Sequence, residues 1–220
     1  MKGWIIVPLG LNEASLELLR AEAYALQPPT PNQQGNCNPP LQSKSSYAIQ
    51  SLLDHPVLTG CLTELLSEPN FASNPELSHP FRCESSLVTI RPPGWTVGEF
   101  SPGFNRPHVV RPVAHAQPMR YQVDGGKIFG GLTTVIVELN DVEKGQGGTA
   151  FLSGSHKAHF NYSGEGARQW MPNATQGGFE ESIMQSMEHY DCPAGSAVIF
   201  TESTHSVQKF SENMSSSEIL

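Results

Sequence analysis

The chain has 220 residues, among them 20 glycines and 18 prolines, and only 15% of its residues are charged. This length suits one domain with a sizeable core, and the many turn-forming residues argue against a helical bundle. A formal net charge of −8 argues against nucleic acid as a partner, because binding phosphates requires clustered Lys and Arg.

Helical patterns are confined to the first third of the chain. Residues 12–26 open with Asn12 as a candidate N-cap and carry apolar residues at helical spacing, which predicts an amphipathic helix. Residues 27–46 are rich in Pro, Asn, Gln and Ser and predict a long loop. A second helix is expected from residue 54 to about residue 67, with Pro56 near its first turn.

Strand patterns take over in the second half. β-Branched and apolar residues fill four runs bounded by Gly, Pro and Ser, at residues 86–91, 132–139, 149–152 and 196–201. No helical pattern separates these runs as it would in a parallel α/β protein. A mainly β fold with flanking helices, built as an antiparallel barrel or jelly roll, is therefore expected.

This pattern divides the expected single domain, residues 1–220, into three parts. Residues 1–79 form a helical and loop part packed outside the barrel, residues 80–210 form the jelly-roll core, and residues 211–220 form an irregular C-terminal tail. The four cysteines form no CxxC pair, which disfavours a zinc ribbon and is typical of reduced intracellular thiols. Pro8 ends the first apolar run and no long apolar span follows, so a cytoplasmic protein without membrane partners is expected.

Two histidines in the second half stand next to strand patterns. His115 precedes the strand at 132–139, and His205 follows the strand at 196–201. A non-haem Fe(II) site usually combines two His with one carboxylate on one face of the metal. In a His-x-carboxylate pair both side chains point to the same side of a strand, because strand side chains alternate. Here the position two residues after His115 holds Gln117, a neutral carboxamide.

Roughly from residue 80 to residue 210, the sequence resembles the phytanoyl-CoA dioxygenase (PhyH) family of Fe(II)/2-oxoglutarate oxygenases. The resemblance rests on His115, the run Gly131–Val142 with the Gly-rich turn after it, the Gly-Ser-His-Lys turn at 154–157, and the run from Pro193 to His205. It implies a double-stranded β-helix (jelly roll), with or without its last strand. It also implies Fe(II) as cofactor, 2-oxoglutarate as cosubstrate, and hydroxylation of a small molecule or acyl chain.

By the same resemblance, His115 and His205 would bind the metal, Gln117 is a further candidate ligand, and no catalytic residue is expected beyond the metal ligands. Thr133 and Thr134 lie on the strand after His115. One of them is expected to face the barrel interior, where its hydroxyl could bind a cosubstrate carboxylate, although β-propensity explains both threonines equally well. His156 is expected to order the Gly-Ser-His-Lys turn rather than to bind the metal.

Two departures from the family pattern keep alternatives open. A carboxamide is a weaker Fe(II) ligand than the carboxylate expected at Gln117. Asp124 and Glu138 are candidate substitutes, although nothing in the sequence places either beside His115. No Arg follows Arg168, so the family's Arg for the cosubstrate carboxylate has no counterpart. A catalytically impaired jelly-roll binding protein is therefore the main alternative. Halogenation is disfavoured because Gln117 is not small, and a cupin-type isomerase usually clusters its His ligands more tightly.

Overall fold

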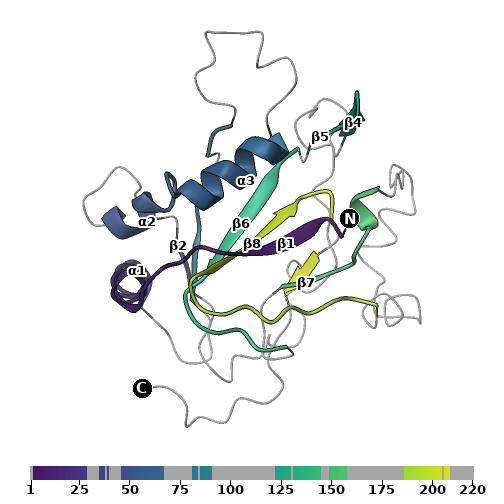
Figure 1. Cartoon of the computed structure of the whole chain (residues 1–220). Coiled ribbons are helices and arrows are strands. Elements are labelled where there is room, and N and C mark those ends of the chain that lie inside the picture. Colours follow the sequence, from purple (N-terminus) through teal and green to yellow (C-terminus); the bar gives the residue numbers. More distant parts are fainter. Residues whose placement is uncertain are drawn as a thin grey trace, which may run out of the picture.

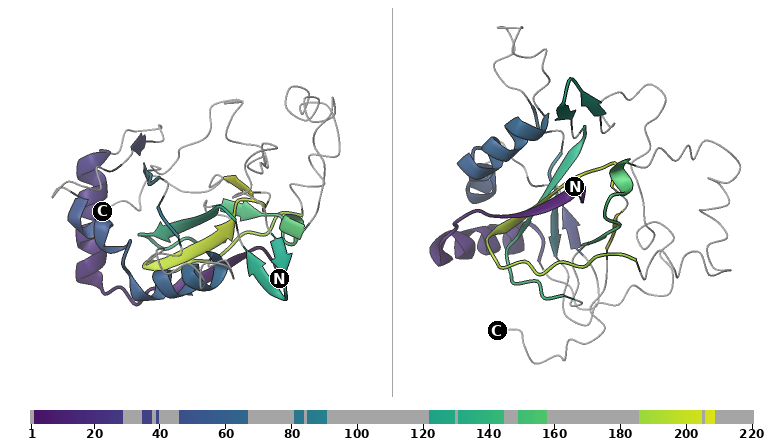
Figure 2. Two further views of the ribbon diagram at one scale, coloured as in Figure 1. Left: turned by 90° about the horizontal axis from the view of Figure 1, so that it is seen from above. Right: turned by 45° about the vertical axis from the view of Figure 1, so that its right-hand side comes forward.

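The computed structural model describes residues 2–28, 35–37, 39, 46–66, 81–83, 85–90, 122–129, 131–144, 149–157, 186–204 and 206–208. Over these residues the protein consists mostly of small antiparallel sheets with three helices. The strands cluster together, and the helices gather towards one side of them (Figure 2, left). The expectation of a mainly β fold with flanking helices is confirmed at this level.

The largest sheet has the strand order β1-β8-β6, with β8 in the middle. It contains β1 (Trp4–Pro8), β8 (Ser196–Thr201) and β6 (Thr133–Glu138), all antiparallel to their neighbours. The register places Val198 of β8 opposite Ile6 of β1 and Ile136 of β6. Figure 1 shows β1, from the start of the chain, lying along β8, from near its end.

One face of this sheet is covered by helix α3 (Pro56–Leu66). Because side chains alternate along a strand, Ala197 and Ile199 of β8 share this face, where they pack with Leu58 of α3 and with Leu9. Val135 and Val137 of β6 join the same cluster. Burying these aliphatic side chains attaches the helix to the sheet, because a fully buried Leu or Ile side chain contributes about 1.5–3 kcal/mol when it leaves water.

The opposite face packs against β7 (Thr149–Phe151), which pairs with β9 (Ser206–Gln208). Val198 and Phe200 of β8 lie in this second cluster together with Phe151 of β7. Trp4 stacks on Phe151 with ring centroids 5.2 Å apart, and both Phe151 and Val198 are fully buried. The central sheet is therefore covered on both sides, by a helix on one side and by strands on the other.

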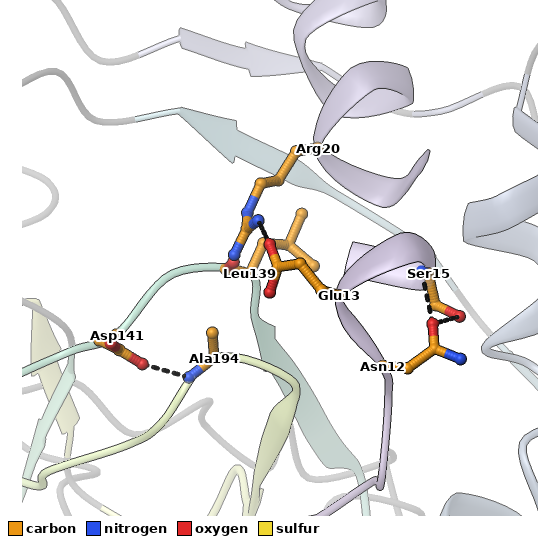
Figure 3. Close-up of polar contacts among 7 residues, drawn as sticks. All are labelled: Asn12, Glu13, Ser15, Arg20, Leu139, Asp141 and Ala194. Carbon is orange, nitrogen blue, oxygen red and sulfur yellow. Dashed lines mark hydrogen bonds and ion pairs between the residues drawn. The ribbon is translucent and has the colours of Figure 1, made fainter. Parts of the chain in front are cut away.

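Helix α1 (Glu13–Leu26) begins at Asn12, whose side-chain oxygen accepts a hydrogen bond of 2.9 Å from the backbone N–H of Ser15. Arg20 of α1 pairs with Glu13 at 2.6 Å and donates to the carbonyl of Leu139, just after β6, at 2.8 Å (Figure 3). This bond ties the helix to the end of the central sheet.

The remaining elements are short. Helix α2 (Tyr47–Ser51) receives its N-terminal cap from α1, because both carboxylate oxygens of Glu22 accept backbone N–H groups, from Ala48 at 2.8 Å and from Ile49 at 3.0 Å. Two antiparallel pairs complete the described strands. They are formed by β2 (Gly35–Cys37) with β3 (Val88–Ile90), and by β4 (Gln122–Asp124) with β5 (Lys127–Phe129).

Most predicted elements are confirmed. The helices at 12–26 and 54–67 correspond to α1 and α3, and the four predicted strand runs correspond to β3, β6, β7 and β8. The sequence pattern did not predict β1, α2, β4, β5 or β9, and β2 lies within the stretch predicted to be loop. No helix among the described residues is long and apolar enough to cross a membrane.

Candidate functional site

Three of the five predicted site residues, His115, Gln117 and His205, lie outside the described residues. Thr133 and Thr134 are described, and so are the two chain neighbours of His205, Thr204 and Ser206. The end of the central sheet that leads into His205 can therefore be followed residue by residue. It is formed by the last residues of β8 and the first residues of β6, which are paired.

The register separates the two candidate threonines of β6. Thr134 lies opposite Phe200, which packs towards β7, whereas Thr133 lies opposite Thr201 on the face of α3. Opposite residues of an antiparallel pair share a face. Thr133 donates its hydroxyl hydrogen to the nearby carbonyl of Gly131 at 3.2 Å. Thr134 is thus the threonine on the face that the two layers of strands enclose.

The hydroxyl of Thr134 donates to the carboxylate of Glu202. Glu202 follows β8 directly, is half-buried, and donates its backbone N–H to the carbonyl of Leu132 at 2.8 Å. It therefore contacts β6 through its side chain and the residue directly before β6 through its backbone. Glu202 is not among the site residues predicted from the sequence. The sequence does contain a signal for its position. Glu202 is two residues after Phe200 and four after Val198, and this spacing predicts that all three side chains lie on the same face of the sheet if the strand continues.

The turn from Thr201 to Thr204, immediately before His205, is anchored on the opposite side by the start of β1. The carbonyl of Gly3 accepts two hydrogen bonds of 3.2 Å, from the backbone N–H of Thr201 and from the hydroxyl of Thr204. Within the turn, the N–H of Thr204 donates to the carbonyl of Thr201 at 2.8 Å. Thr204 is 1% exposed, so the residue before the candidate ligand is fixed in a buried position.

The Gly-Ser-His-Lys motif forms a short 3-10 turn, η4 (Ser155–Lys157), beside the start of β1 (Figure 1). The N–H of Gly154 donates to the carbonyl of Lys2 at 2.8 Å, and His156 is buried. A Cβ atom on Gly3 would lie 2.5 Å from both His156 Nδ1 and Thr204 Oγ1. Burial, and then the charge of Lys157, lower the pKa of His156, which favours its neutral form. The predicted loop-ordering role of His156 agrees with this packing.

Glu138, considered above as a substitute carboxylate, lies at the other end of β6. It faces Ser196 at the start of β8, and its carboxylate accepts a hydrogen bond of 2.5 Å from the Tyr190 hydroxyl. It lies four positions along the strand from Thr134, a distance of about 13 Å. Burial, and then the negative charge of Glu138, raise the pKa of Tyr190. Glu138 therefore belongs to a buried polar network remote from the turn that precedes His205.

Among the residues that the structure describes, no three His, Cys, Asp or Glu side chains gather in a way that could hold a metal ion. At this end of the sheet, Thr134 and Glu202 form a hydroxyl–carboxylate pair on the enclosed face. Beside it lies an anchored turn that leads to His205.

The fold is similar to that of solved non-haem iron enzymes. HygX from Streptomyces hygroscopicus, solved with nickel and 2-oxoglutarate bound, matches over 97% of this chain and 78% of its own, with a TM-score of 0.66 and 15% identity. The non-haem alpha-ketoglutarate-dependent carbocyclase SnoK from nogalamycin biosynthesis matches over 97% of this chain and 76% of its own, with a TM-score of 0.57 and 17% identity.

The epimerase SnoN from the same biosynthesis matches over 96% of this chain and 72% of its own, with a TM-score of 0.52 and 15% identity. No protein-family model matches the sequence, and comparison with curated proteins gives no match. At these sequence identities the structural similarity establishes the fold but not the reaction, which depends on the residues of the site.

Proposed function

We propose that this protein is an Fe(II)- and 2-oxoglutarate-dependent oxygenase of the PhyH type that acts on a small molecule. The observation that carries the proposal is the fold, because 97% of the chain aligns with an enzyme solved with 2-oxoglutarate and a divalent metal bound. HygX has also been solved with hygromycin B bound, and SnoN with nogalamycin RO. A small organic substrate is consistent with these neighbours.

We assign the jelly-roll core to residues 80–210, to which β1 adds one strand from the N-terminal part, and the metal-binding imidazoles to His115 and His205. These residues fit an Fe(II) centre by their donor chemistry, because imidazole nitrogen is a good ligand for this metal. The anchored turn from Thr201 to Thr204 supports the assignment of His205, because a metal ligand must be held in a defined place. With Fe(II) and 2-oxoglutarate bound there, dioxygen would be the oxidant: one of its oxygen atoms would enter succinate as 2-oxoglutarate loses carbon dioxide, and the other would go to the substrate.

The protein's own contribution would be binding, orientation and exclusion of water. Of the two threonines considered for the cosubstrate, Thr133 lies on the α3 face. Thr134 lies on the enclosed face, but its one hydroxyl hydrogen is donated to Glu202, so we keep neither as a ligand of the cosubstrate carboxylate. The apolar side chains of Trp4, Phe151 and Phe200 line the same layer. Their packing would exclude water from this layer, which strengthens electrostatic contacts made at its edge.

The test is metal-dependent release of succinate from 2-oxoglutarate by the purified chain, with Fe(II) binding measured separately by anaerobic calorimetry. We expect His205→Ala to lose both metal binding and succinate release. His189→Ala, which removes an imidazole from a segment given no role in the site, should retain both. A wild-type chain that binds no Fe(II) at micromolar protein would sink the proposal.

Gln117 favours a second candidate, a jelly-roll protein that binds a small molecule without turnover. With a carboxamide at this position, the site has less negative charge to hold Fe(II) than the usual two-His-one-carboxylate set. Gln117→Asp distinguishes the two. If the wild-type chain binds Fe(II) but releases no succinate, and Gln117→Asp gains release, the protein is an impaired member of the same fold.

A further inference from the structure

Three segments that are distant in the sequence meet at the start of β1. The carbonyl of Lys2 accepts the N–H of Gly154 at 2.8 Å, which ties the Gly-Ser-His-Lys turn to this point. The carbonyl of Gly3 accepts the N–H of Thr201 and the hydroxyl of Thr204, each at 3.2 Å, which ties the turn after β8 to the same point. These three hydrogen bonds, with the residues that form them, are called the Gly3 junction.

The side chain of His156 lies within the Gly3 junction. His156 is 5% exposed, and a Cβ atom on Gly3 would lie only 2.5 Å from its Nδ1 atom. The same added atom would lie 2.5 Å from the hydroxyl oxygen of Thr204. The imidazole is therefore packed where η4, the start of β1 and the turn after β8 come together, and it can gain hydration only if one of these segments moves.

The charges around the junction oppose a positive charge on this ring. Burial, and then the positive charges of Lys157 and of the chain's amino terminus, lower the pKa of His156. The other charged side chains described in these segments already have partners. Lys2 forms an ion pair with Glu188 at 2.5 Å, and the carboxylate of Glu202 accepts a hydrogen bond from β6. A protonated His156 would thus be an ion with little hydration, repelled by its sequence neighbour.

We propose that His156 is a pH-sensitive switch at the Gly3 junction: the neutral imidazole keeps the junction closed, and protonation in mildly acidic solution opens it. Opening separates the Gly-Ser-His-Lys turn and the turn after β8 from Lys2 and Gly3, while the pairing of β1 with β8 from Trp4 to Pro8 remains. Histidine is suited to this role, because its charge changes near neutral pH. The switch does not require that the chain binds a metal.

The direction of the pH effect follows from where the proton binds. In the open junction the imidazole is hydrated and has its ordinary pKa, near 6.5, whereas the closed junction lowers that pKa. The stability of the closed junction is therefore fully present above about pH 6.5 and is lost as the pH falls towards the lower, closed-state value. Opening should be about three- to tenfold more populated at pH 5.5 than at pH 7.5.

Hydrogen exchange at single amides, measured by NMR on the full chain without added metal, tests this switch. The reporters are the N–H groups of Gly154 and Thr201, because their acceptors are the carbonyls of Lys2 and Gly3. Their protection factors, corrected for the intrinsic effect of pH on exchange, should fall by about three- to tenfold between pH 7.5 and pH 5.5. The amide of Ile199, in the middle of β8, is the reference and should keep its protection.

Two variants assign the effect to this imidazole. His156→Gln retains a polar side chain but cannot titrate, so the protection of Gly154 and Thr201 should be the same at both pH values. His55→Gln removes an imidazole directly before α3, away from the junction, and should behave as wild type. Should His156→Gln fail to fold, titration of the His156 ring protons in wild type replaces it. A midpoint below pH 6.5 is expected, and a midpoint at or above that value would overturn the inference.

Three further results would overturn it. The first is protection of Gly154 and Thr201 that does not change with pH in wild type. The second is the same loss of protection in His156→Gln as in wild type, because another group would then take up the proton. The third is an equal loss at Ile199, because acid would then unfold the whole sheet rather than open the junction.

Discussion

Gly3 occupies a space that admits no larger residue. Its φ of +94° lies in the region that favours glycine, and a Cβ there would come within 2.5 Å of two side-chain atoms, His156 Nδ1 and Thr204 Oγ1. Both neighbours are buried and held by the surrounding backbone. The absence of a side chain at Gly3 thus brings together the start of β1, the Gly-Ser-His-Lys turn and the turn before His205.

We predict that Gly3→Ala lowers the free energy of unfolding by about 2–4 kcal/mol, from backbone strain plus overpacking. Gly10→Ala is the matched control. Gly10 also has a positive φ, +68°, but a Cβ there would meet nothing within 4 Å, so the loss should be about 1 kcal/mol. Urea denaturation measures both. Equal losses in the two variants would show that the packing at Gly3 contributes nothing.

Cys192 should make stability depend on alkaline pH. Burial, and then the charge of Glu138, raise the pKa of its thiol from 9.0 to about 11. Because the folded-state pKa is raised, this contribution to stability is fully present below pH 9 and is lost as the pH rises towards 11. Between pH 8 and pH 10, we expect wild type to lose about 1 kcal/mol more than Cys192→Ala. If urea denaturation gives wild type and Cys192→Ala the same dependence of unfolding free energy on pH, the prediction is wrong. Cys83→Ala, which removes an exposed thiol, is the control.

At the scale of elements, strand β1 shows why part of the fold could not be predicted from the sequence. The run Trp4–Pro8 is short, and its only described strand partner, β8, lies about 190 residues further along the chain. Short apolar runs without a local partner carry little strand signal. Similarly, α2 has five residues, and its cap comes from Glu22 of another helix. By contrast, β8 was predicted with its observed bounds, because a β-branched run between Gly and polar residues defines it locally.

The two faces of β1 provide a matched test of its packing. Ile6 packs in the cluster between the strand layers, whereas its neighbour Ile5 is 54% exposed. We predict that Ile6→Asp costs at least about 3 kcal/mol or prevents folding, because it buries a carboxylate among apolar groups. Ile5→Asp should cost less than about 1 kcal/mol. Thermal unfolding of the pair measures the difference, and similar midpoints would mean that β1 does not pack as described.

The candidate site was predictable only in part. The sequence predicts that Thr133 and Thr134 lie on one strand, but it does not predict which face of the sheet each side chain occupies. The run from Thr133 to Val137 is β-branched throughout and shows no alternation of polar and apolar residues. The pairing register supplied that information. Glu202 could not be predicted as part of this region, because the residue that its side chain contacts, Thr134 of β6, lies 68 residues away in sequence. The metal-ligand assignments of His115, Gln117 and His205 stay predictions.

At the scale of the whole molecule, the proposed function predicts stabilisation by ligands. Any group that binds only the folded state raises its stability, by about 2.7 kcal/mol at a concentration one hundred times the Kd. For a chain of this size that corresponds to a rise of about 5–10 °C in Tm. We expect Ni(II) with 2-oxoglutarate to produce this shift in wild type and not in His205→Ala. An equal shift in both proteins would remove His205 from the ligand set.

The position of β8 between β1 and β6 has a consequence for biosynthesis. Neither outer strand of the central sheet can pair as described until residue 201 has left the ribosome, since both take their partners from β8. During most of translation the apolar residues of β1 and β6 therefore lack their native cover. Non-local pairing of this kind slows folding and exposes strands to aggregation. Yield of native protein should accordingly depend on chaperone supply and growth temperature more than on the thermodynamic stability of the finished fold.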